Sequence, residues 1–175
     1  MAFLLIPIFL ILFYLFVFYN FITSLRGQMI ISFDQLHKQL EAYFTIIPRL
    51  TGFIRSSGYS EMEMTQAFQT ARSLAKTAHT PYELALVYSN MEHGVSRLRY
   101  IARQNPALAA NDDYISLNNQ LINHDEKIQF ALAFYHEKME RYNRAVLGFP
   151  GRMAANIFRF GYWAPFEADS RDEDE

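Results

Sequence analysis

Residues 1–25 read MAFLLIPIFLILFYLFVFYNFITSL, and none of them is Asp, Glu, Lys, Arg or His. A helix rises ~1.5 Å per residue, so about 20 residues cross a hydrocarbon core ~30 Å thick. We therefore predict a transmembrane helix over 1–25, which places Phe3, Leu10, Phe16 and Ile22 inside the bilayer.

Two other structures pass the same test of length and composition, a buried core helix and a cleaved signal peptide. A core helix of this length needs a larger fold around it than the remaining residues supply. A signal peptide has a basic N-terminal region and small residues before its cleavage site, and Tyr19-Asn20-Phe21-Ile22 offers no Ala-x-Ala pattern. We expect an uncleaved single-pass anchor. Because the first basic residues, Arg26 and Lys38, follow the span, the positive-inside rule favours a cytoplasmic C-terminal domain.

Composition narrows the function classes. The chain has 175 residues, a formal net charge of −2 and no Cys. Without Cys there is no disulfide, thiolate nucleophile or Cys-ligated metal centre. No basic patch is large enough to follow a phosphate backbone, so we expect no nucleic-acid partner. Beyond the anchor, ~150 residues correspond to one domain.

The rest of the chain shows helical periodicity nearly throughout. Apolar residues at spacings of three and four run from Phe33 to Ile54, which predicts one helix bent at Pro48. Two later helices begin at the predicted capping boxes Ser60–Glu63 and Thr80–Glu83.

The last predicted helix is the longest, from an Asn111 cap to Gly148. Its apolar stripe contains Tyr114, Leu117, Leu121, Ile128, Leu132, Tyr135, Met139, Tyr142 and Val146. No strand alternation is present. We predict an all-α fold, in which the transmembrane helix leads into an antiparallel up-and-down four-helix bundle. Three chain reversals bring the C-terminal tail back to the bilayer. The predicted domain ranges are 1–25 for the anchor, 27–150 for the bundle, 151–168 for an aromatic membrane-proximal tail, and 169–175 for a disordered acidic end.

Several short motifs follow one another along the chain, among them Tyr19-Asn20, Ile47-Pro48, Tyr142-Asn143, Phe149-Pro150 and Phe160-Gly161. In this order they resemble the LemA family, over essentially the whole chain except its acidic end. The resemblance implies a membrane-anchored helical bundle of bacteria, located in the inner membrane or in an organelle membrane derived from it. One branch of that family resembles proteins of magnetosome membranes.

The sequence offers no strong candidate for catalysis or metal binding. A di-iron bundle needs two Glu-x-x-His pairs, and the nearest match is the single Asp34-x-x-His37. His124 falls on the apolar stripe of the last helix, where a polar layer fixing helix register and a ligand site are both open. We predict no catalytic residues, no cofactor and no metal, and hence a protein that is not an enzyme.

The aromatic tail has two possible placements. Tyr162 and Trp163 lie close to Arg159, and such residues favour both a membrane interface and a cap on the bundle. Our preferred hypothesis is a membrane-tethered scaffold whose partners are membrane lipid, other proteins and further copies of itself. The alternative is an accessory factor in organelle-membrane (magnetosome) biogenesis or iron-mineral formation.

Overall fold

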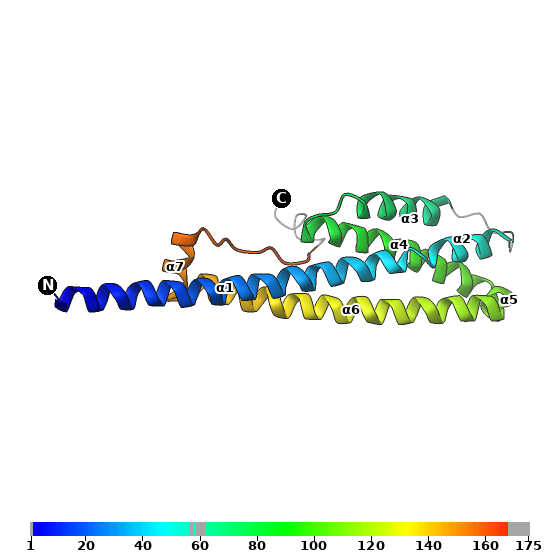
Figure 1. The fold of residues 1–175 in the computed structure, drawn as a ribbon. Helices are drawn as coiled ribbons and strands as arrows, with labels where there is room; N and C mark the ends of the chain where they lie inside the picture. Colours follow the sequence, from blue (N-terminus) through cyan, green and yellow to red (C-terminus); the bar gives the residue numbers. More distant parts are fainter. Residues whose placement is uncertain (1, 57, 59–61, 168–175) are drawn as a thin grey trace. The chain divides into compact units, whose positions relative to one another are not determined.

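The computed structural model describes residues 2–56, 58 and 62–167, which form helices and connecting turns with no strand among them. The predicted all-α fold is confirmed. Figure 1 shows the helices in chain order. They are α1 (Ala2–Tyr43), α2 (Ile47–Ser56), α3 (Met62–Ala75), α4 (Pro81–Gln104), α5 (Pro106–Ala109), α6 (Asp112–Leu147) and α7 (Gly151–Phe158).

Helix α1 carries the predicted span and continues well beyond it. It runs without a break through Gly27, and its 42 residues extend ~63 Å. Among the described residues, this is the one helix long and apolar enough to cross a membrane, with a mean hydropathy of 2.2 over its most apolar window. The predicted anchor is therefore the first half of a longer helix.

The prediction of one bent helix through Pro48 is wrong. Helix α1 ends at Tyr43, a turn follows, and α2 begins at Ile47. Pro48 thus lies in the first turn of α2, where a missing N–H removes no intrahelical hydrogen bond. The apolar periodicity continues across the break because Tyr43 and Ile47, on the two sides of the turn, are both buried.

The chain divides into two compact units, which we describe separately. Helices α1 and α6 each contribute residues to both units. The boundaries of the units therefore differ from those of the predicted domain ranges. Those ranges stay predictions, and 169–175 lies outside the described residues. Unit 1 contains residues 1–34 and 133–164, and unit 2 contains 35–132 and 165–175.

In unit 2, α3 packs closely along α4 (Figure 1). A Cβ atom placed on Gly94 of α4 would lie 2.5 Å from Cε1 of Phe68 in α3, so the missing side chain makes room for that ring. Ala67 and Ala71 of α3 are also buried. These small residues allow α3 and α4 to approach each other closely.

The predicted helix caps are confirmed where the structure describes them. Thr80 and Glu83 form a reciprocal capping box at the start of α4. The Asn111 side chain accepts hydrogen bonds from the backbone N–H groups of Asp113 and Tyr114 at the start of α6. Ser60 lies outside the described residues. The stripe of α6 is buried as predicted, with Leu132 half-buried.

Helix α7 was not predicted. Pro150 precedes its first residue and is joined to Phe149 by a cis peptide bond. The helix ends at Arg159, which adopts the left-handed conformation (φ 56°), and the Phe160 N–H closes the end on the Ala155 carbonyl. With only eight residues between two irregular ends, its periodicity was too short to recognise in the sequence.

Candidate functional site

In unit 1, a side chain of α6 binds the backbone of the C-terminal tail. The Nδ2 of Asn143 donates a hydrogen bond to the Trp163 carbonyl oxygen at 2.9 Å, and the Trp163 N–H donates to Asn143 Oδ1 at 2.9 Å. Because the backbone around Trp163 is not helical, its N–H and carbonyl groups have no hydrogen-bond partners within a helix. An amide side chain offers both a donor and an acceptor, so Asn143 pairs with both groups. Asn143 is 7% exposed, so the pair is shielded from water.

Two tyrosines continue this attachment along α6. The Tyr142 hydroxyl donates to the Gly161 carbonyl at 3.0 Å, and the Tyr135 hydroxyl donates to the Ala164 carbonyl at 2.8 Å. Burial raises the pKa of both tyrosines above the ordinary value, which keeps the hydroxyls protonated and able to donate. We call Tyr135, Tyr142 and Asn143 the tail clamp.

The same unit joins the tail to the end of the predicted span. The Tyr19 ring lies 5.1 Å from the Phe158 ring and 5.9 Å from the Phe160 ring, measured between centroids. Phe18 lies beside Gly151, where an added Cβ would come within 3.1 Å of its ring. Within unit 1, residues 151–160 therefore contact Phe18 and Tyr19, and the membrane-proximal position of the tail stays a prediction.

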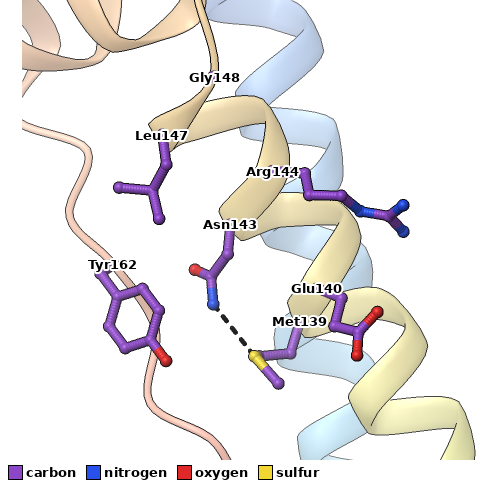
Figure 2. A pocket seen from close by; sticks show the side chains of 7 residues that line it. All are labelled: Met139, Glu140, Asn143, Arg144, Leu147, Gly148 and Tyr162. Carbon is purple, nitrogen blue, oxygen red and sulfur yellow. Dashed lines mark hydrogen bonds between the residues drawn. The ribbon is translucent and has the colours of Figure 1, made fainter.

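A groove of about 630 Å³ lies between α6 and the tail. Figure 2 shows Leu147 and Tyr162 on the tail side of α6, with Glu140 and Arg144 pointing away from Tyr162. The groove is lined by Met139, Glu140, Asn143, Arg144, Leu147, Gly148 and Tyr162. With its two charged groups turned outward and no nucleophile–base pair among its lining residues, the groove suits apolar contact better than reaction chemistry.

The two units differ in charge. Unit 1 carries six basic residues against three acidic ones, whereas the whole chain has 16 basic and 18 acidic residues. The unit that contains the apolar span is therefore the basic one, and the acidic excess belongs to unit 2. The basic residues of unit 1 are Arg26, Lys138, Arg141, Arg144, Arg152 and Arg159.

Unit 2 contains a separate group of polar side chains, most of them half-buried. The Tyr88 hydroxyl lies 3.3 Å from Asp125 Oδ1 and accepts a hydrogen bond of 2.7 Å from Gln129 Nε2. Tyr43 is 1% exposed, and its ring packs edge-on against His124 with 6.1 Å between centroids. His124 is half-buried beside this ring, and its two predicted roles, in a polar layer that fixes helix register or in a ligand site, both stay predictions.

Burial dominates the titration of this group. Burial raises the pKa of Tyr43, Tyr88 and Glu92. The negative charge of Asp125 raises the pKa of Glu92 further. Burial also lowers the pKa of His124, with Lys127 acting in the same direction. These shifts all disfavour charge in the interior. Among the residues that the structure describes, no three or more metal-ligating side chains come together.

The residues predicted to lie in the bilayer divide into two kinds. Leu10 and Phe16 are 58% and 66% exposed, as lipid-facing side chains of an isolated span are. Ile22 is fully buried, and Leu25 follows at 3%. Phe3 lies in α1. The end of the apolar run therefore packs inside unit 1 and is part of the folded core.

The motif residues gather mainly in unit 1. Tyr19 with Phe160, and Tyr142 with Gly161, are contact pairs, and Asn143 lies beside Tyr142 in the tail clamp.

The other motif residues, and the two candidates for the membrane interface, lie elsewhere. Asn20 donates to the Phe16 carbonyl within α1, and Pro150 precedes α7. Ile47 and Pro48 begin α2 in unit 2. Tyr162 is 59% exposed, whereas Trp163 is half-buried.

Sequence reasoning missed the clamp role of Tyr135 and Asn143. Both lie on or beside the apolar stripe of α6, where packing is the ordinary explanation for Tyr. The signal in the sequence was an Asn directly beside Tyr142 of the predicted buried stripe. An amide buried in a core needs hydrogen-bond partners.

Comparison with known proteins identifies a family. No curated protein matches the chain, and a sequence model of the LemA family matches residues 32–175. The match covers α6, α7 and the tail clamp, and begins after Tyr19 and Asn20. With most of its length matched, this chain belongs to the LemA family.

Proposed function

We propose that this protein is a non-enzymatic, single-pass membrane-anchored scaffold of the bacterial envelope. The observation that carries the proposal is the packing of Phe18, Ile22 and Leu25, at the end of the apolar run, inside unit 1. An anchor joined to its domain by a loose linker leaves the domain free to reorient. An anchor whose end is part of the core fixes unit 1 at the membrane surface.

The basic residues that follow the span support a cytoplasmic location for the domain. The positive-inside rule counts Lys and Arg close to the span. Arg26 follows the span directly, and Lys38 comes twelve residues later. The arginines that unit 1 takes from residues 133–164 lie too far along the chain to count in this rule, so Arg26 and Lys38 carry the proposed orientation.

Unit 2 offers a surface for protein partners. Ile115, Ile122 and Phe130 are spaced seven and eight residues apart on α6 and are 44%, 42% and 76% exposed. Exposed apolar residues that recur on one side of a helix are typical of helix-mediated contacts. Self-association through this side of α6 is the simplest case.

Two experiments test the proposal. The full-length protein should stay in the membrane during alkaline carbonate extraction, and recovery in the soluble fraction would contradict anchoring. A photocrosslinking amino acid at Phe130 should capture a defined partner or a second copy in cells. The same group at Gln69, exposed on α3, is the matched control. Equal capture at both positions would argue against a dedicated surface.

Membrane orientation has its own test. Because the chain has no Cys, Gln69→Cys creates a single thiol. An impermeant maleimide applied to spheroplasts should leave it unlabelled until the membrane is lysed. The magnetosome alternative stays a prediction, and neighbouring genes for iron transport or mineral formation would favour it.

A further inference from the structure

Three large apolar side chains form a row that the fold leaves uncovered in unit 1. Phe149, Met153 and Ile157 are spaced four residues apart and are 88%, 66% and 64% exposed. Phe149 precedes α7, and the other two lie on one side of it, because residues four apart share a helix face. We call these three residues the apolar row.

The other sides of α7 have different chemistry. Ala154 and Ala155 are each 1% exposed, and Gly151 is buried beside Phe18 of α1. Arg152 is exposed on a third side, with Asn156 one turn later. Small residues thus hold α7 on the protein, which leaves the apolar row and a polar row facing outward.

The contacts of α7 fix its level along α1. It meets Phe18 and Tyr19, seven and six residues before Leu25, where the predicted span ends. At ~1.5 Å per residue, this position is about 9–10 Å inside the end of the span. Figure 1 shows α7 running across α1 and not along it. A helix in that position lies along the membrane plane at the depth of ~5–10 Å that interfacial amphipathic helices occupy.

We propose that α7 is an interfacial helix whose apolar row inserts into the lipid leaflet while Arg152 and Arg159 contact the phosphates of anionic lipids. The proposal rests on the proposed membrane anchoring of α1. Lipid is favoured as the occupant because α7 packs against the end of the apolar span, whose other large side chains are exposed, and because unit 1 is basic. The protein is then attached to the membrane through both α1 and α7, which prevents it from rotating about α1 alone.

Nitroxide labelling of the full chain in lipid vesicles tests the proposal. Met153→Cys and Ile157→Cys each supply a single thiol for the label, and Asn156→Cys is the control on the polar row. In vesicles of phosphatidylcholine and phosphatidylglycerol, labels at 153 and 157 should collide more with dissolved oxygen and less with a water-soluble nickel complex. The label at 156 should show the opposite preference.

Equal nickel accessibility at all three positions would overturn the proposal. Strong dipolar broadening between labels at 153 would also overturn it, because a second copy would then cover the apolar row. A label at Leu12→Cys separates the two proposals. If it is lipid-shielded while 153 and 157 are in water, anchoring stands and the interfacial helix fails. If Leu12→Cys is itself in water, both fail.

The arginine contacts have their own test. Replacing Arg152 and Arg159 with Gln, in the chain labelled at Met153→Cys, should move the label toward water in phosphatidylglycerol vesicles. Vesicles of phosphatidylcholine alone should produce the same shift with the original arginines. A label depth that is independent of both changes would overturn the phosphate contacts.

Discussion

The side-chain amide of Asn143 pairs with both backbone polar groups of Trp163, at 2.9 Å for each hydrogen bond. This residue of α6 thereby fixes the middle of an irregular tail that starts twelve residues after α6 ends. The pairing leaves the Trp163 side chain half-buried. Asn143 consequently links α6 to the tail segment around Trp163.

Asn143→Ala should release the tail. Losing two shielded hydrogen bonds, each worth ~0.5–1.5 kcal/mol net, should cost about 1–3 kcal/mol in local stability. Trp163 is the only Trp in the chain, so its emission should shift to longer wavelength and become more sensitive to iodide. Asn123→Ala, exposed on the same helix, is the control. Unchanged Trp163 emission in Asn143→Ala would show that the amide does not hold the tail.

Two glycine substitutions should have opposite signs. Gly94→Ala places a Cβ 2.5 Å from the Phe68 ring and should cost about 1–3 kcal/mol, because the packed ring must move. Gly52→Ala lies within α2 with no atom inside 4 Å, and should stabilise by about 0.5–1 kcal/mol. Chemical denaturation of each variant measures both. A stabilising Gly94→Ala would mean that α3 and α4 are less closely packed than described.

Glu92→Gln should increase stability at neutral pH. Burial and the negative charge of Asp125 raise the pKa of Glu92 from its ordinary value of 4.5. When the pKa of a carboxyl is higher in the folded state than in the unfolded state, the fold favours its protonated form. The fold is then most stable below the pKa of the unfolded state, and this stability is lost as the pH rises through the pKa of the folded state. The melting temperature of Glu92→Gln should therefore exceed that of the original chain at pH 7, and the difference should shrink toward pH 4.

Glu126→Gln, exposed on α6, is the matched control and should change the melting temperature little at either pH. If Glu92→Gln lowers the melting temperature at pH 7, then the Glu92 carboxylate has a favourable partner in the fold, and burial is not the dominant influence on it.

Removing residues 1–25 should affect the two units differently. The deletion takes away Phe18 and Ile22, which are 9% and 0% exposed in unit 1. Without them α7 loses its contact with α1, so residues 149–164 should become sensitive to limited proteolysis. Helix α4 and its capping box belong to unit 2 and should keep their protection. Equal resistance of both regions would show that the end of the span is not needed for unit 1.

The helices could be predicted where their signals are local. Thr80, Pro81 and Glu83 specify the start of α4 through side-chain capping and a preset backbone angle. The break between α1 and α2 could not be predicted, because Ile46 and Ile47 are both buried and keep the apolar pattern continuous across the turn. Periodicity reports which side chains are buried, and a short turn that buries the same face leaves it unchanged.

The sequence alone determined the all-helical fold, the apolar span and the family, because periodicity, caps and ordered motifs are properties of neighbouring residues. The tertiary structure alone decided that Ile22 is core and that Asn143 holds Trp163. It also assembled the basic unit around the end of the span. These relationships join positions more than a hundred residues apart or depend on an irregular tail. Long-range packing and backbone hydrogen bonds set them, and no local periodicity encodes either.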